Sequence, residues 1–160
     1  MIEAFITFLF IGYLKPGPGT WGSVSGILLA YPIHTYGGPV LLFLIIILLG
    51  FFGTLAISYT TKDSNKVDRE QIIIDEVVGQ LIALIPISVV AHFYQQTTTN
   101  IGILVFISFL SFRFFDIVKL GPIKRADQRD DAFGVMLDDV YAGIVSGVII
   151  TIIMVIIYVF

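Results

Sequence analysis

Five acidic residues lie within apolar stretches of the sequence, or one turn inside the ends of such stretches, where carboxylates are costly. A charged side chain costs roughly 2.5–3.5 kcal/mol at the centre of a membrane span and less toward the interface, so acids in spans are candidates for function. With no cysteine in the chain and only two histidines, an oxygen-only ligand set suits Mg²⁺. The catalytic candidates are Asp75, Glu76, Asp116, Asp138 and Asp139, and the predicted Mg²⁺ ligands are Asp75, Glu76, Asp116 and Asp139.

The same acids have a plainer interpretation as charges at helix termini. Asp75–Glu76 and Asp138–Asp139 lie near the expected starts of helices, where the helix dipole favours negative charge. Asp116 lies near the expected end of a helix, where the dipole disfavours an anion. We therefore favour the metal site, and capping remains the alternative.

Two basic residues flank Asp116 at helical spacing. Arg113 precedes it by three positions and Lys119 follows it by three, so each pair would share one helix surface. Arg113 either neutralises Asp116 or binds an anionic headgroup through its bidentate fork. Lys119 either extends its ammonium to the interface or binds phosphate. The sequence leaves both choices open.

A glycine-rich turn precedes the second apolar stretch. Gly19, Gly22, Ser23 and Gly26 recur at helical spacing, which is typical of a small-residue face for close helix packing. The same turn could present backbone N–H groups and the hydroxyls of Thr20 and Ser23 to a phosphate. We retain Thr20 and Ser23 as candidate phosphate-binding residues.

The composition indicates the class of protein in which these residues lie. Of the 160 residues, 57% are apolar and 13% are charged, against about 45–50% and 25% in soluble domains. This excludes a soluble globular enzyme and a disordered chain. The net charge of −3 gives no basic surface for nucleic acid. We expect one membrane-embedded domain, residues 1–160, folded as an all-α polytopic bundle.

We expect about five full spans and a short N-terminal helix. Residues 1–14 are apolar but too short to cross fully, which predicts an interfacial or re-entrant helix. The expected spans are continuously apolar and do not alternate as barrel strands do. The expected spans are residues 21–36, 40–59, 72–94, 101–118 and 134–160, with a break at 37–39 and polar loops at 60–70, 95–100 and 119–131.

The distribution of basic residues predicts the orientation. Seven of the nine Lys and Arg residues lie in the loops 60–70 and 119–131, whereas 37–39 and 95–100 contain none. The positive-inside rule places the two basic loops in the cytoplasm. The start of span 72–94, the end of 101–118 and the start of 134–160 then share that face. All five acids are therefore expected at one membrane depth, on the cytoplasmic side.

Four motifs in order carry a resemblance to a known family. They are PGTWGS at 18–23, DEVVG at 75–79, FRFFDIVK at 112–119 followed by Pro122 and Ile123, and GVMLDDVYAG at 134–143. Together they resemble the phosphatidylglycerophosphatase A family of bacterial inner-membrane lipid phosphatases. The family usually has Pro after the Lys of the third motif, where this chain has Leu120 and Gly121.

The resemblance implies a substrate and a reaction. A family member would remove the terminal phosphate of phosphatidylglycerol phosphate, in a Mg²⁺-dependent reaction, and release phosphatidylglycerol. The substrate would be a phospholipid, and the oligomeric state stays open. Because the bilayer already solvates lipid tails, we expect specificity to lie in the headgroup, with no dedicated pocket for the acyl chains.

Three other functions each require features that the sequence lacks. A small cation transporter or channel subunit would use the acids as an ion path, but it needs charges spread through the membrane depth. A CDP-alcohol phosphotransferase needs a D-G-x-x-A-R run, which the sequence lacks. A histidine-based lipid phosphatase needs a catalytic His, and His34 and His92 are expected near the face opposite the acids.

Overall fold

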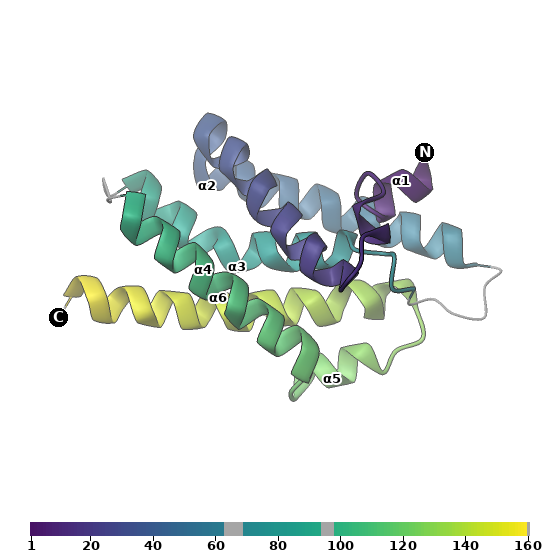
Figure 1. Ribbon diagram of the computed structural model, residues 1–160. Coiled ribbons are helices and arrows are strands. Elements are labelled where there is room, and N and C mark those ends of the chain that lie inside the picture. The colour runs from purple at the N-terminus through teal and green to yellow at the C-terminus, as the bar shows by residue number, and fades with distance from the viewer. Residues whose placement is uncertain (63–68, 94–97, 160) are drawn as a thin grey trace.

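Every regular element is a helix in the part of the chain that this computed structural model describes, residues 1–62, 69–93 and 98–159 (Figure 1). The charged stretch expected as a loop at 119–131 contains a helix of its own. Of the polar loops expected at 60–70 and 95–100, residues 63–68 and 95–97 lie outside the described residues, and 98–100 are helical rather than loop. The elements are α1 (Ile2–Ile6), a 3₁₀ turn η1 (Ile11–Tyr13), α2 (Pro18–Thr61), α3 (Ile74–Phe93), α4 (Thr98–Val118), α5 (Pro122–Asp127) and α6 (Ala132–Val159).

The long helix α2 reverses direction at Gly38. Gly22 and Gly53 both pack against the start of α3, although a straight helix would separate them by about 46 Å. Gly38 has φ 61° and ψ −159°, a conformation that residues with a side chain rarely adopt, and Pro39 follows it. The helix therefore consists of two antiparallel arms, residues 18–37 and 39–61, which confirms the break expected at 37–39.

Four helices are long and apolar enough to cross a membrane. They are Pro18–Thr61, Ile74–Phe93, Asn100–Val118 and Ala132–Ile157. The short segments α1 and η1 are not among them, in keeping with the expectation that residues 1–14 do not span. The all-α bundle of apolar helices is thus confirmed, with four candidate spans.

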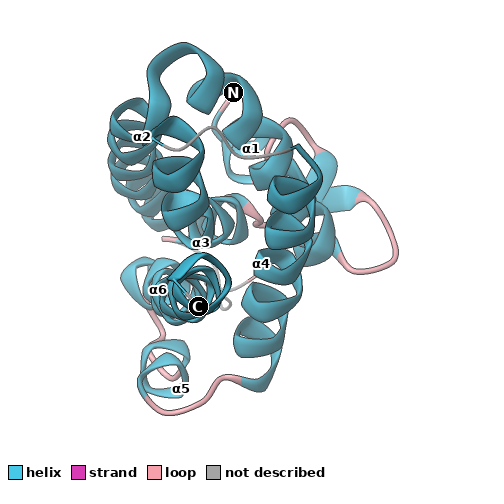
Figure 2. Ribbon diagram, turned by 90° about the vertical axis from the view of Figure 1, so that its left-hand side faces the viewer, coloured by secondary structure: helices cyan, strands magenta, loops and turns pink. Residues whose placement is uncertain are grey.

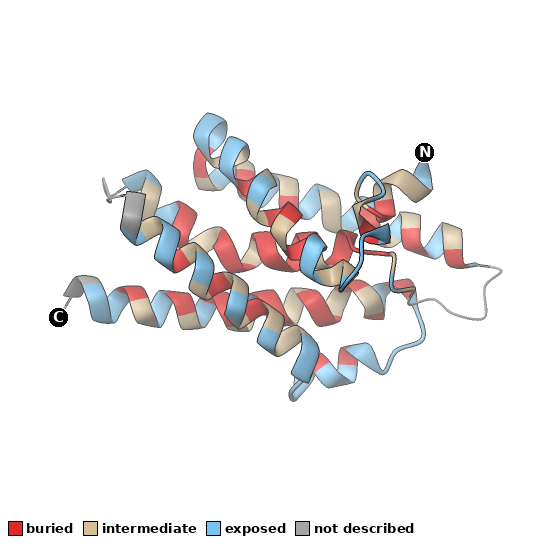
Figure 3. Cartoon of the chain, in the orientation of Figure 1, coloured by how far each residue is buried: buried red, intermediate tan, exposed pale blue. Residues whose placement is uncertain are grey.

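The helix α3 occupies the centre of the bundle. It contacts α2, α4 and α6, and Figure 2 shows these three helices around it. In its most apolar stretch, 61% of the residues are buried, against 22% in α2 and in α4 (Figure 3). The outward faces carry exposed large apolar side chains such as Leu48, Phe52 and Phe106. A soluble protein would bury these side chains, whereas a lipid environment accommodates them.

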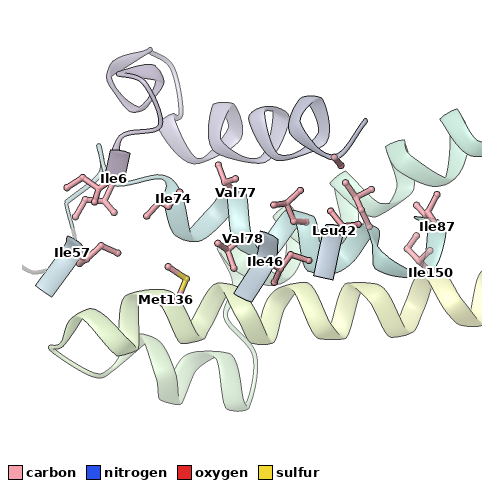
Figure 4. Close-up of a cluster of buried hydrophobic side chains, with 14 of the residues drawn as sticks. Ile6, Leu42, Ile46, Ile57, Ile74, Val77, Val78, Ile87, Met136 and Ile150 are labelled. Carbon is pink, nitrogen blue, oxygen red and sulfur yellow. The ribbon is translucent and has the colours of Figure 1, made fainter. Parts of the chain in front are cut away.

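The apolar core joins helices that are distant in the sequence. Figure 4 shows Ile6 of α1, Ile57 of α2 and Ile74 of α3 directed toward one another, and each is fully buried. The amide of Ile73 donates a hydrogen bond of 3.0 Å to the carbonyl of Ile6, which ties the N-terminal segment to the start of α3. The N-terminal turns therefore help to fix the end of α3 that carries Asp75 and Glu76.

Glycine permits a close crossing of α3 and α6. A Cβ on Gly143 of α6 would collide with the carbonyl oxygen of Gly79 of α3. A Cβ on Gly79 would in turn lie 2.7 Å from the carbonyl oxygen of Asp139. Close backbone approach through small residues is a common way to pack helices in membranes. This crossing brings the first turns of α3 and α6 together.

The segment between α4 and α6 turns twice before α6 begins. Lys119 and Gly121 have φ values of 50° and 56°, and Pro122 then starts α5. Helix α6 starts two residues before the expected Gly134, because the Oδ1 of Asp131 accepts a hydrogen bond of 2.7 Å from the Gly134 amide and caps its first turn.

Candidate active site

Three carboxylates from two helices form an acidic cluster, defined here as Asp75, Glu76 and Asp139. One carboxylate oxygen of each residue lies within 4.8 Å of the other two. Asp75 and Glu76 lie in the first turn of α3, and Asp139 lies in the second turn of α6. Asp75 and Asp139 are buried, and Glu76 is nearly so. The crossing at Gly79 and Gly143 explains why these two turns meet.

The chemistry of the acidic cluster fits a hard divalent cation. The Oε2 of Glu76 and the Oδ1 of Asp139 are buried and have no hydrogen-bond partner among the described residues. Buried oxygen atoms of this kind are rare and demand an explanation. Carboxylates held so close also repel one another unless a cation or protons balance their charge. An oxygen-only ligand set is the one that Mg²⁺ prefers.

Asp116, the fourth predicted ligand, is engaged differently. Its Oδ2 accepts a hydrogen bond of 2.5 Å from Nη1 of Arg113, and the side chains are 13% and 16% exposed. The charge of Asp116 still acts on Asp139 and Glu76, so it lies beside the acidic cluster. Of the two uses of Arg113 that the sequence left open, the ion pair is present. The buried Nε of Arg113 has no partner among the described residues.

The glycine-rich turn meets the acidic cluster at Gly19. A Cβ on Gly19 would collide with Oε1 of Glu76 and would lie 2.9 Å from Nη1 of Arg113. The start of α2, the start of α3 and the last turns of α4 therefore converge at one point. Any side chain at position 19 would displace the carboxylate or the guanidinium.

The two predicted phosphate-binding hydroxyls differ in their surroundings. Thr20 is exposed at the start of α2. Ser23 is buried, and its hydroxyl donates a hydrogen bond of 2.9 Å to the carbonyl of Gly19. Cβ atoms on Gly22 and Gly26 would lie 3.1 Å from atoms of α3, so this face also serves close packing. Both interpretations of the turn are therefore compatible with its position.

Lys119 does not share a helix surface with Asp116, contrary to the sequence expectation. Helix α4 ends at Val118, and the positive φ of Lys119 turns the chain away. Its Nζ donates a hydrogen bond of 2.7 Å to Oδ2 of Asp138 and another to Asp127. Burial alone would lower the pKa of the ammonium group, but these hydrogen bonds raise it above its ordinary value. Lys119 therefore stays charged and neutralises Asp138.

The structure thus divides the five predicted acids into three groups. Asp75, Glu76 and Asp139 form the acidic cluster, Asp116 pairs with Arg113 next to it, and Asp138 pairs with Lys119. Sequence reasoning missed Asp127, because only the turns around α5 return it to Lys119. It also missed the contact of Gly19 with Glu76, for which the repeated glycines were the available signal.

Comparison with known proteins identifies relatives of this chain. Residues 4–154 match the family model described as Phosphatidylglycerophosphatase A. The chain is similar to a Haemophilus influenzae protein named phosphatidylglycerophosphatase A, with 35% identity over 141 residues that cover 87% of this chain and 80% of the relative. It is also similar to an Escherichia coli protein of the same name, with 31% identity over 131 residues that cover 81% of this chain and 69% of the relative.

No solved structure matches this chain. The family model spans all four motifs and every residue of the acidic cluster. The chain therefore belongs to the phosphatidylglycerophosphatase A family.

Proposed function

We propose that this chain hydrolyses the terminal phosphomonoester of phosphatidylglycerol phosphate, releasing phosphatidylglycerol and inorganic phosphate, at the acidic cluster and Arg113. The family and its named relatives support the reaction. The observation that carries the site is the convergence of Gly19, Glu76 and Arg113, which brings a helix start, a carboxylate and a guanidinium to one point. Phosphoryl transfer depends mainly on positioning and charge stabilisation, which these groups can provide.

Asp75, Glu76 and Asp139 would hold Mg²⁺, with Asp116 as a neighbouring carboxylate. When bound, the cation supplies Lewis-acid polarisation of the phosphoryl oxygens. The cation alone cannot balance several carboxylates and a phosphate of roughly −1.5 to −2 charge. Arg113 would supply further positive charge through its guanidinium, and Lys119 would do so from the side of Asp138.

The start of α2 would form the second side of the phosphate site. A helix N-terminus carries partial positive charge and unpaired N–H groups, which suit an anion. The hydroxyl of Thr20 is exposed and could contact the headgroup directly. The buried hydroxyl of Ser23 would make a weaker contact with the phosphate. The nucleophile is either a water molecule activated at the site or one of the Asp carboxylates.

Five crossings would bring this site to the cytoplasmic face. Each arm of α2 has about the length that a bilayer requires, and α3, α4 and α6 add three more crossings. The basic residues of the α4–α6 connection lie at the end that holds the acidic cluster, and the positive-inside rule favours the cytoplasm for them. A lipid phosphomonoester lies at that depth. The chain contains no cysteine, so single cysteines can test this orientation.

The orientation test compares two exposed positions at opposite ends of the bundle. A cysteine at Tyr36 should react with an impermeant reagent added to intact cells, and a cysteine at Arg125 should react only after the membrane is opened. The reverse pattern would contradict the cytoplasmic assignment. Wild-type protein, which has no thiol, provides the background.

The function is tested by measuring phosphate release from phosphatidylglycerol phosphate in mixed micelles, with Mg²⁺ and then with EDTA. We expect release that EDTA abolishes and that added Mg²⁺ restores. Phosphatidic acid, whose phosphomonoester lacks the intervening glycerol, serves as the comparison lipid. Absence of release from every phosphomonoester lipid would contradict the proposed function, and activity unaffected by EDTA would contradict the metal.

The transporter alternative is disfavoured by where the charges lie. No Asp, Glu, Lys or Arg occurs in α2, in α3 after Glu76, in α4 before Arg113 or in α6 after Asp139. An ion path needs polar groups through the whole membrane depth. The acids at one end therefore suit a reaction at an interface better than transport across it.

A further inference from the structure

An apolar cavity of about 260 Å³ lies between the first arm of α2, α3 and α4, in the half of the bundle away from the acidic cluster. Its walls include residues from all three helices: Ile27, Ala30, Leu84, Ile87, Gly102 and Val105. His34, Ser88 and Tyr31 also line it, and His34 and Ser88 are hydrogen-bonded to each other at 2.7 Å. Their mutual bond leaves the cavity suited to an apolar ligand.

The cavity lies one lipid leaflet away from the acidic cluster. Along α3, Leu84 and Ser88 follow Glu76 at about 12 and 18 Å, since a helix rises 1.5 Å per residue. Along α4, Val105 and Gly102 precede Arg113 at about 12 and 16 Å by the same rise. Half of the hydrocarbon core of a bilayer measures about 15 Å. An acyl chain that starts from a headgroup at the acidic cluster therefore ends at this level.

We propose that this cavity receives the distal part of one acyl chain of the lipid whose phosphate occupies the active site. The proposal rests on the proposed function and adds an acyl-chain subsite to it. It replaces the expectation, drawn from the sequence, that the tails need no pocket. Helices α2, α3 and α4 contribute to both sites, so a lipid held at Arg113 and Glu76 keeps its own tail beside the cavity.

The substrate's own chain has an advantage over other lipids because it is tethered. Once the headgroup is bound, entry of the tail is an intramolecular step with a high effective concentration. Transfer of a tail from bilayer to cavity gains little hydrophobic free energy, because both surroundings are apolar. The main favourable contribution to tail binding is therefore van der Waals packing, because an unfilled cavity leaves the atoms of its walls without contacts. The cavity therefore selects chain length more than it increases overall affinity.

The hydrogen-bonded pair His34 and Ser88 forms a polar part of the cavity wall, about one helical turn beyond Leu84 along α3. A chain that reaches this pair fills the space, and a longer one has to bend outward or press on polar groups. Substrates whose chains end near Ser88 are thus expected to react best. Shorter chains leave part of the cavity without a partner.

Gly102 allows the cavity to be filled without disturbing the helices. A Cβ at this position meets no atom within 4 Å, so a leucine can extend into open space. Leucine also favours a helix more than glycine does. The matched control is Ile103→Phe, which adds bulk to the next residue of α4, on a side chain that is 55% exposed and outside the cavity lining. Val105→Ala should have the opposite effect, because it enlarges the cavity.

The experiment measures kcat/KM for phosphatidylglycerol phosphates of increasing acyl length in mixed micelles. We expect Gly102→Leu to lower the value for long chains about tenfold, at the low end of what a methylene contact is worth in a pocket. The value for dihexanoyl lipid should not change. Val105→Ala should shift the acyl length with the highest kcat/KM toward longer chains. Ile103→Phe should leave the dependence of kcat/KM on acyl length unchanged.

The outcomes separate this proposal from the proposed function. If wild-type protein hydrolyses the headgroup phosphate but Gly102→Leu and Val105→Ala both keep its length profile, the acyl-chain subsite is wrong and the function stands. Equal losses at all lengths in Gly102→Leu, with Val105→Ala unchanged, contradict the subsite in the same way. If wild-type protein hydrolyses no lipid of any length, the proposed function itself is wrong.

Discussion

The surroundings of the two ends of α3 differ in how much room they leave next to a glycine. At the start of α3, Gly19 and Gly79 stand where no Cβ fits, and the side chains against Gly19 are charged. Farther along α3, Gly102 faces open space beside an apolar cavity. The charged end is therefore defined by contacts that allow little displacement. We expect the apolar end to tolerate changes of shape, because most of the side chains that line its cavity are apolar.

Among substitutions that test this difference, we expect the largest loss of activity at Asp139, in the charged end. Asp139→Asn keeps the shape of the side chain and removes its charge from the acidic cluster, so kcat should fall by roughly 100-fold or more. The Mg²⁺ concentration for half-maximal rate should rise. Phosphate release titrated with Mg²⁺ measures both quantities. Asp130→Asn, at an exposed site outside the cluster, is the control, and a near-normal rate for Asp139→Asn at low Mg²⁺ would favour capping instead.

The same substitution at two glycines compares the ends of α3 directly. Gly19→Ala should lower kcat/KM by about 10- to 100-fold, because its methyl group displaces Glu76 or Arg113 and small misplacements are costly in active sites. Gly102→Ala should be neutral or slightly stabilising, since its methyl group meets nothing and alanine favours helices. Kinetics and thermal unfolding in detergent check both. Equal effects at the two positions would remove the contrast.

A smaller effect is expected where Arg113 is replaced by lysine. Arg113→Lys keeps the charge next to Asp116 but loses the planar fork, so turnover should fall by about tenfold if the guanidinium also contacts phosphate. Mg²⁺ dependence should change less than turnover. Steady-state kinetics beside a Mg²⁺ titration separate the two. Full activity in Arg113→Lys would mean that Arg113 serves only as the ion-pair partner of Asp116.

The smallest effect concerns the cap of α6, which holds Asp139 in place from outside the bundle. The hydrogen bond from Arg129 and then the Gly134 amide lower the pKa of Asp131. A lowered pKa means that the carboxylate stabilises the fold at neutral pH and loses this contribution as pH falls through its folded-state pKa, below about pH 4. Asp131→Asn keeps a good cap without the charge. Its unfolding temperature should be slightly lower at pH 7, and the difference should vanish in acid.

The sequence predicted the features that depend on composition and chain order. Long apolar runs predicted the helices, and the alternation of basic and neutral loops predicted that Asp75, Asp116 and Asp139 would gather at one end. The reversal at Gly38 followed from the local preferences of Gly and Pro. These features depend on residues that are close in the sequence, so they can be predicted without knowledge of tertiary contacts.

Other features depended on contacts that no periodicity encodes. The partner of Lys119 could not be foreseen, because it is set by the positive φ after Val118 and by the position of α5. The ion pair of 3.2 Å between Arg69 and Glu3 joins residues from opposite sides of α2 in the sequence. The cavity near Gly102 arises from the shape left between three helices, which apolar residues alone do not specify.

The reversal of α2 also bears on how the chain is made. Residues 18–61 contain no Asp, Glu, Lys or Arg, and only a Gly-Gly-Pro bend joins the two arms. If both arms cross, as proposed, they can enter the bilayer together during synthesis, as one hairpin with no polar loop to translocate. Moving a formal charge through the membrane field changes the energy by about 2.3 kcal/mol per 100 mV, and this segment carries none. Its insertion should therefore be insensitive to the proton motive force, even in cells whose membrane potential has collapsed.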